Sequence, residues 1–216
     1  MPRRPAFPPI LELLQDLELL AGGGPHAEAK YAPGRGTRAQ KRHRVETAFE
    51  LAVATALEAA GFRTRRLGSK KPGQRKPDAI AFPPVSPKYA LVVDAKVAAA
   101  GYSLPAKDQR ALAEYAKKYS RQLRGIGCEK LHLLVISSSF PGDYRSAIES
   151  IKQGCRDTIL DRVYLVPARL LREIVLHKLS EARLGEPFLE ELFVSGPDVF
   201  DSAHVQEARV KIGETF

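Results

Sequence analysis

The chain has 216 residues, of which 44% are hydrophobic and 27% are charged. This composition supports a buried core and excludes disordered, collagen-like and low-complexity proteins. The net charge of +9 is spread unevenly, because residues 1–126 carry 23 Lys and Arg against 11 Asp and Glu, whereas residues 127–216 carry 11 against 14. The basic half favours a phosphate backbone as partner, although such a charge also serves solubility alone.

The cysteine content and the hydropathy indicate the cellular compartment in which the protein works. Cys128 and Cys155 are too few for a disulfide framework or a zinc site and favour a reducing environment. The apolar stretch near the N-terminus is interrupted by Glu12, Asp16 and Glu18, unlike a signal peptide. No run approaches the roughly 18 apolar residues that span a bilayer. We therefore expect a soluble, cytoplasmic protein.

The N-terminal part of the chain predicts one helix, a loop and a longer helix. Residues 9–20 have apolar side chains at helical spacing, and residues 21–40 are rich in Gly, Ala and Pro, which predicts a loop or flexible connection. Residues 44–60 form the clearest helix, because their apolar side chains share one face and Gly61 follows as a C-cap. We interpret residues 1–43 as an N-terminal helix and a flexible basic segment.

Strand and helix patterns alternate along the rest of the chain. The predicted elements are, in order, strands at 62–67, 78–82 and 89–97, a helix at 105–124, a strand at 131–138, a helix at 143–153, a strand at 163–166 and a helix at 168–183. This order predicts an α/β sandwich with a mixed central β-sheet flanked by helices. The main domain spans residues 44–195, and residues 196–216 form a C-terminal tail that looks peripheral.

Three acidic residues and a lysine could form a catalytic site. Asp94 and Lys96 end the apolar strand 89–97, and residues i and i+2 of a strand point to the same face. Asp78 starts the preceding strand, so a hairpin would bring it close to Asp94. Glu50 lies on the long helix beside its apolar face. Ordinary alternatives exist, since Asp-x-Lys is common in strands, Asp78 could be a turn residue and Glu50 a solvated one.

Two carboxylates beside a lysine suit phosphodiester hydrolysis. Mg²⁺ prefers oxygen ligands and usually takes one or two carboxylates, with water and substrate phosphate completing its shell. In this interpretation Asp78, Asp94 and the carbonyl of Ala95 hold Mg²⁺, for which Mn²⁺ can substitute. Lys96 orients the attacking water and offsets charge that develops on the phosphoryl group. Glu50 anchors a metal-coordinated water or a second metal.

The order Glu…Pro-Asp…Asp-x-Lys resembles the PD-(D/E)XK nuclease superfamily. More narrowly, the stretches AGFRTRRLGS, KPDAIAF, VVDAKVAAAGYSLP and LLVISSSFPGDY resemble the cleavage domain of the FokI family of type IIS restriction endonucleases. The resemblance implies a restriction-endonuclease-like fold and Mg²⁺-dependent cleavage of double-stranded DNA, one strand per catalytic domain. It assigns Asp78, Asp94 and Lys96 to the catalytic triplet, and Glu50, with Glu46 as the alternative, to the helix carboxylate.

The resemblance also bears on assembly. In the family an acid and an arginine, four residues apart on the helix after the Asp-x-Lys strand, pair across a two-fold dimer. Here Arg110 and Glu114 hold those positions with the signs exchanged. They can form either a dimer contact or an i,i+4 pair within one helix.

Few residues outside the catalytic domain remain that could recognise DNA. Bases would be read by the N-terminal segment or by a partner subunit, or cutting would be weakly specific. Phosphate contacts are expected at Arg63, Arg65, Arg66, Lys70, Lys71, Arg75 and Lys76. The alternative is a charged sheet edge that resists aggregation.

These observations give one main functional hypothesis and two alternatives. The main hypothesis is a restriction-type, Mg²⁺-dependent endodeoxyribonuclease that acts as a homodimer or with a DNA-recognition subunit. The alternatives are a structure-directed repair or recombination nuclease of the same fold, and a DNA-binding module that does not cleave.

Overall fold

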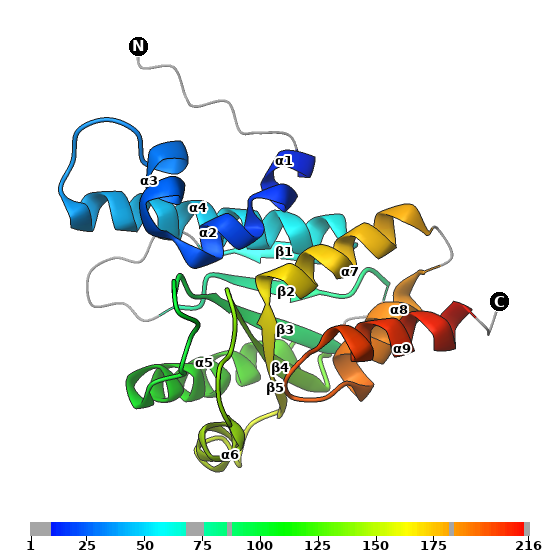
Figure 1. Ribbon diagram of the computed structural model, residues 1–216. Coiled ribbons are helices and arrows are strands. Elements are labelled where there is room, and N and C mark those ends of the chain that lie inside the picture. Colours follow the sequence, from blue (N-terminus) through cyan, green and yellow to red (C-terminus); the bar gives the residue numbers. More distant parts are fainter. Residues whose placement is uncertain (1–9, 68–75, 86–87, 182–183, 214–216) are drawn as a thin grey trace.

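The structure is a computed structural model, and it describes residues 10–67, 76–85, 88–181 and 184–213. Helices pack around one β-sheet (Figure 1). The helices are α1 (Ile10–Gln15), α2 (Leu17–Gly22), α3 (Gly24–Tyr31), α4 (Arg38–Ala59), α5 (Ala106–Arg124), α6 (Arg145–Gln153), α7 (Ala168–Ser180), α8 (Glu186–Glu190) with a π-helical turn, η1 (Glu191–Ser195), and α9 (Ser202–Gly213). The strands are β1 (Arg63–Arg66), β2 (Ala79–Phe82), β3 (Tyr89–Ala95), β4 (Lys130–Ser137) and β5 (Leu160–Pro167).

The five strands pair in sequence order, β1-β2-β3-β4-β5. The first three strands are antiparallel neighbours, whereas β3, β4 and β5 run parallel. β3 and β4 are buried on both faces, as expected of central strands, whereas the three arginines of the edge strand β1 are exposed. The mixed central sheet and the β2–β3 hairpin predicted from the sequence are therefore confirmed.

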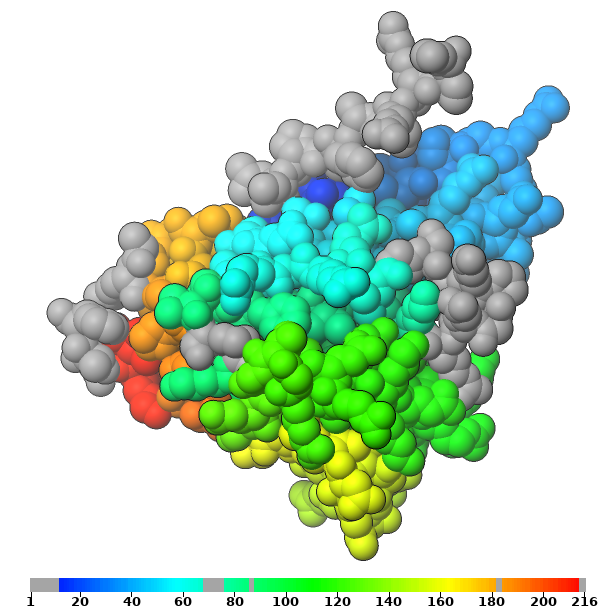
Figure 2. All heavy atoms as spheres, turned by 180° about the vertical axis from the view of Figure 1, so that it is seen from behind, coloured from blue at the N-terminus to red at the C-terminus, as the bar shows by residue number. Residues whose placement is uncertain are grey.

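Each face of the sheet is covered by its own helices. α4, α7 and the N-terminal helices cover one face, where Phe49 and Leu57 of α4 join Leu91 of β3 in the core (Figure 1). α5 and α6 cover the other face, where Leu112 packs in a cluster with Val92 of β3. Figure 2 shows α5 spread across the back of the molecule. Within the described part of the chain, no helix has the length and apolar character needed to cross a membrane.

The predicted loop at residues 21–40 is largely helical. α3 lies inside it, and Ala27 of α3 is fully buried in the core. The chain turns between α2 and α3 at Gly23, whose φ of 63° favours glycine. α4 begins at Arg38 rather than at residue 44, because Thr37 and Gln40 form a capping box that starts the helix earlier.

The C-terminal tail is also part of the fold. Phe200 is buried in the same cluster as Tyr164 of β5, and α9 buries Val205 there. Val199 forms a bridge to Leu165, which ties the tail to the end of the sheet. The tail is therefore part of the core and not the peripheral segment that the sequence predicted. Its apolar side chains cover the outer strand β5.

His132 of β4 lies in a buried aromatic setting beneath this layer. Its ring centroid is 5.3 Å from that of Tyr89 and 5.5 Å from that of Tyr164. The side chain is fully buried, and neither ring nitrogen hydrogen-bonds to any of the described residues. Burial lowers the pKa of His132 to about 4, against the opposing effect of Asp161. The folded protein therefore holds His132 neutral at physiological pH.

This buried imidazole predicts acid sensitivity. Between about pH 6.5 and pH 4 the unfolded chain binds a proton at His132 that the folded chain excludes, so stability falls as the pH falls through this window. Between pH 7.5 and pH 4.5 we expect His132 to account for a loss of about 2–3 kcal/mol in the free energy of unfolding. Urea unfolding of wild type and His132→Leu at both pH values measures it.

The matched control is His26→Leu, because His26 is exposed on α3. This variant should keep the wild-type pH dependence, whereas His132→Leu should flatten it. Equal pH dependence of wild type and His132→Leu would contradict the assignment.

Candidate active site

The site forms where β2 and β3 separate at the end of their ladder. The last paired residues are Ala79 and Val93, and one step beyond them come Asp78 and Asp94. The backbone N–H of Asp78 still donates to the carbonyl of Val93, at 2.9 Å. The side chain of Asp78 then takes over the ladder, because its Oδ2 accepts the N–H of Ala95 at 2.7 Å. Asp78 is therefore held at the sheet end rather than in a solvated turn.

Asp94, near the end of β3, pairs with Lys96, which directly follows the strand. The Lys96 Nζ lies 2.8 Å from Asp94 Oδ2, and the side chains are 22% and 1% exposed. Lys96 is held by β4, since its N–H donates to the carbonyl of Ile136 at 2.8 Å and its carbonyl accepts the hydroxyl of Ser137 at 2.7 Å. The predicted convergence of Asp94 with Lys96 is present, with the lysine nearer to solvent.

The backbone of Ala95 supplies a further oxygen at this point. The N–H and C=O of one extended residue point to the same edge of a strand, and alternate residues bond to opposite neighbours. The N–H of Ala95 points to Asp78 and that of Lys96 to β4, so the carbonyl of Ala95 faces the Asp78 side. Two carboxylates and one carbonyl thus form the donor set around the end of β3.

The predicted helix carboxylate, Glu50 or Glu46, lies on α4 and not on the strands that carry Asp78 and Asp94. Glu50 is partly buried in the middle of α4, which packs on β1 and β3. Glu46, the alternative, accepts a hydrogen bond from Arg42 at 2.9 Å on the exposed side of the helix. Across residues 10–67, 76–85, 88–181 and 184–213, no three His, Cys, Asp or Glu side chains converge into a group able to hold a metal ion. The role of Glu50 as the helix carboxylate stays a prediction.

The loop that follows Lys96 is braced by the loop after β4. The N–H of Tyr102 donates to the carbonyl of Ser139 at 2.9 Å, and the hydroxyl of Tyr144 donates to the carbonyl of Tyr102 at 2.6 Å. The hydroxyl of Tyr102 donates to Asp108. Burial raises the pKa of Tyr102, and the carboxylates of Asp108 and Asp94 raise it further.

Sequence reasoning missed the bracing roles of Tyr144 and Ser137. Nothing in their local spacing marks them, because their partners are up to 42 positions away in the chain.

The predicted nucleic-acid contacts are only partly visible. Arg63, Arg65 and Arg66 are exposed along the edge strand β1, and Lys76 is partly buried before β2. Lys70, Lys71 and Arg75 lie outside the described residues. The exposed arginines are accessible from solvent, and their contact with phosphates stays a prediction.

The predicted dimer residues share an exposed surface. Arg110 and Glu114 lie one turn apart on α5, and both line a cavity of about 370 Å³ between α5 and α6. Both side chains are accessible to a second molecule.

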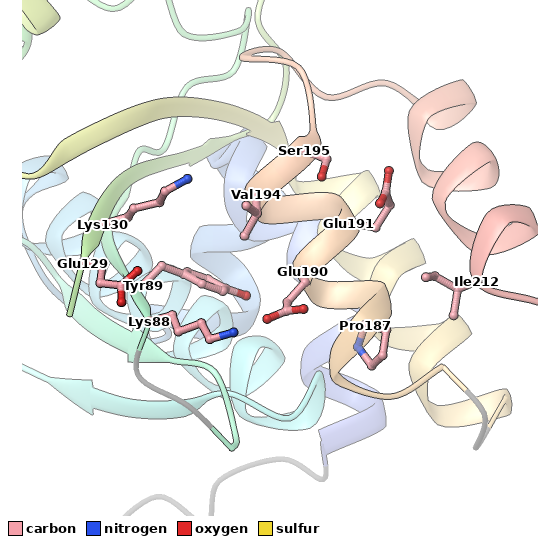
Figure 3. Close-up of a pocket in the computed structure, with 10 residues that line it drawn as sticks. All are labelled: Lys88, Tyr89, Glu129, Lys130, Pro187, Glu190, Glu191, Val194, Ser195 and Ile212. Atoms are coloured by element: carbon pink, nitrogen blue, oxygen red, sulfur yellow. The ribbon is translucent and has the colours of Figure 1, made fainter. Parts of the chain in front are cut away.

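A separate cavity of about 460 Å³ lies at the opposite end of β3 and β4 (Figure 3). Lys88 and Lys130 line it together with Glu129 and Glu190, and Tyr89 points into it (Figure 3). Tyr89 is five residues before Asp94, or about 17 Å along a strand. This cavity, with its mixed charges, is therefore not part of the candidate active site.

The sheet order and the Asp78–Asp94–Lys96 site define a restriction-endonuclease-like α/β fold. The chain belongs to the FokI cleavage-domain family, whose model matches residues 24–194. The structure of restriction endonuclease FokI is similar with a TM-score of 0.53 and 19% identity, covering 82% of this chain and 32% of that one. The structure of restriction endonuclease FokI bound to DNA is similar with a TM-score of 0.53 and 18% identity, covering 83% of this chain and 33% of that one. No curated protein matches the sequence.

The loop brace predicts a glycine requirement beside the site. Gly101 has a φ of 87°, and a Cβ there would lie 2.5 Å from Pro141 Cδ and 2.7 Å from Ser139 Oγ. Gly127 has nearly the same φ, 89°, but nothing lies within 4 Å of its Cβ position. Gly127→Ala should cost about 1–2 kcal/mol through backbone strain alone, whereas Gly101→Ala should cost roughly 1–3 kcal/mol more through overpacking. Urea unfolding compares them, and equal losses would contradict the brace.

Proposed function

We propose that the protein is a Mg²⁺-dependent endodeoxyribonuclease of the restriction type that hydrolyses phosphodiester bonds of double-stranded DNA. The observation that carries the proposal is the joining of the buried Asp94–Lys96 pair to Asp78 through the N–H of Ala95. Membership of the FokI cleavage-domain family supports a nuclease acting on DNA. The chain spans about a third of the length of the FokI chains that it matches, so the activity of the whole enzyme is itself part of the proposal.

The donor set fits a hard divalent cation. Asp78, Asp94 and the carbonyl of Ala95 would hold Mg²⁺, because it takes oxygen ligands and usually only one or two carboxylates. When bound, Mg²⁺ supplies a Lewis acid for the phosphoryl oxygen and lowers the pKa of water. Mn²⁺ has the same ligand preference and should substitute.

The other steps of the reaction are assigned to side chains of the protein. Lys96 is 22% exposed and held through its backbone by β4, so its ammonium can reach a phosphate while Asp94 fixes its direction. There it orients the attacking water and stabilises the negative charge that grows on the phosphoryl oxygens. Glu50, from α4, positions water at the edge of the site. The exposed Arg63, Arg65 and Arg66 of β1 contact phosphates and thereby hold the duplex in register.

The two alternatives predict different products. A structure-directed repair or recombination nuclease would cut branched or flapped DNA in preference to linear duplex. A binding module would bind DNA without cutting, but clustered buried acids that face phosphate weaken such binding. The catalytic arrangement therefore favours cleavage, and base reading falls to the N-terminal segment or to a partner subunit.

Plasmid digestion tests the assigned residues. With Mg²⁺ the wild type should convert supercoiled plasmid to nicked and linear forms. Asp94→Ala and Lys96→Ala should each reduce the rate by roughly 100-fold or more, since each removes charge stabilisation from the transition state. Gel quantification over time measures the rates, and excess EDTA should abolish cutting by the wild type.

The matched control is Lys88→Ala, which removes an exposed lysine at the other end of β3. It should cut at the wild-type rate. Equal cutting by wild type, Asp94→Ala and Lys96→Ala would refute the assigned roles, and cutting in EDTA would refute the metal requirement.

Cleavage of both strands further suggests a two-fold dimer through Arg110 and Glu114. In such a dimer, Arg110→Glu alone or Glu114→Arg alone places like charges opposite each other and should weaken self-association. A mixture of the two variants restores both contacts and should form heterodimers. Sedimentation velocity over a concentration series measures this. Unchanged association of each single variant would assign the pair to a contact within one helix.

A further inference from the structure

A cavity of about 460 Å³ at the start of β3 and β4 takes no part in the proposed nuclease function. The starts of these strands form one wall, and the segment from α8 through η1 forms the other (Figure 3). Its volume lies in the range of small-molecule binding sites. The π-helical turn η1 contributes Glu191, Val194 and Ser195 to the lining, and π-helical turns occur frequently at functional sites. We call this cavity the β3–α8 cavity.

A buried hydroxyl points into the β3–α8 cavity. Tyr89 is 1% exposed, and its ring is held against His132 with the ring centroids 5.3 Å apart. The hydroxyl end of Tyr89 extends toward Glu190 of α8 (Figure 3), but the hydroxyl has no hydrogen-bond partner in the described part of the chain. Burial raises the pKa of Tyr89, and the carboxylates of Glu190 and Glu186 raise it further. The hydroxyl therefore stays protonated, and it can donate to a ligand and accept from one.

The α8 wall of the cavity presents a carboxylate that is not neutralised. Glu190 is partly buried, and among the residues that the structure describes no cationic side chain lies within ion-pair distance of it. The neighbouring Glu191 differs, because the Nζ of Lys211 lies 2.9 Å from its Oε1. Glu190 is therefore the acidic group of this wall that can take a cationic partner.

The strand wall of the cavity presents a cation that can still donate. The Nζ of Lys130 lies 3.5 Å from Oδ2 of Asp161, which does not line the cavity. An ammonium has three donors, so Lys130 keeps donors for a ligand. Lys88 and Glu129 also line the cavity, but they are exposed and their opposite charges cancel. The cavity thus offers a carboxylate on one wall and an ammonium on the other, which is complementary to a molecule that carries both charges.

We propose that the β3–α8 cavity binds a free α-amino acid with an apolar side chain. The ammonium of the ligand pairs with Glu190, its carboxylate accepts from Lys130, and the hydroxyl of Tyr89 hydrogen-bonds to the ligand between them. The side chain of the ligand packs on Val194 and Ile212. A ligand with one charge would satisfy one wall and leave the opposite charge of the other wall without a partner. The inference is independent of the proposed nuclease function, because none of these residues belongs to the candidate active site.

Isothermal titration calorimetry of the full chain with L-leucine, L-methionine and L-phenylalanine tests the proposal. At least one of them should bind with a Kd between about 10 μM and 1 mM. Two analogues of L-leucine each lack one charged group: 4-methylpentanoate has no ammonium, and 3-methylbutylamine has no carboxylate. Each analogue should bind about 10-fold or more weakly than L-leucine, because each loses a hydrogen bond between charged groups.

Two variants with matched controls locate the site. Tyr89→Phe removes only the hydroxyl and should raise the Kd by roughly 3- to 10-fold. Its control is Tyr164→Phe, because the hydroxyl of Tyr164 is also buried without a partner in the described residues but does not line the cavity. Glu190→Gln keeps the size of the side chain and should raise the Kd by about 10-fold or more. Its control is Glu207→Gln, which changes an exposed carboxylate of α9. Both controls should bind as the wild type does.

Three results would overturn the proposal. The first is that none of the three amino acids gives saturable heat with the wild type. The second is that either singly charged analogue binds as tightly as L-leucine, since the cavity would then select one charge and not a zwitterion. The third is that Tyr89→Phe and Glu190→Gln bind no more weakly than Tyr164→Phe and Glu207→Gln, which would place the binding elsewhere on the protein. Thermal unfolding of each variant without ligand checks that it is folded.

Discussion

One hydrogen bond, from the N–H of Ala95 to the carboxylate of Asp78, organises the candidate site. β2 and β3 part at this point, so the backbone ladder no longer satisfies Ala95, and a buried donor without a partner would cost about 1–3 kcal/mol. Asp78 supplies the missing acceptor. The same bond fixes the edge to which the carbonyl of Ala95 points, and it holds the strand end that carries Asp94 and Lys96.

The two ends of the sheet have different physical characters. At the end of β3 lie carboxylates, a lysine and a loop braced through Tyr102 and Tyr144. Near its start, His132 lies neutral among aromatic rings. Charge that is needed for chemistry is therefore kept at the edge of the core, where substrate and water can compensate it, while the interior of the sheet is left without charge.

The family and the solved structures place these features in context. The family match covers residues 24–194, which includes α3 and the capped start of α4 as well as the catalytic strands. The chain spans only about a third of the length of the FokI chains that it matches. The exposed arginines of β1 are suited to holding a duplex, whereas recognition of sequence requires contacts to base edges.

The sequence by itself determined the order of strands and helices from Gly61 to α7, the hairpin and the Asp94–Lys96 pair, because these depend on local periodicity and on neighbours in the chain. It misjudged residues 21–40 and the tail, whose helices are stabilised by burial of residues such as Ala27 and Phe200 against distant elements. Only the tertiary structure decided the bracing of the site by Ser137 and by Tyr144. These contacts join segments that are tens of residues apart, and no local pattern encodes them.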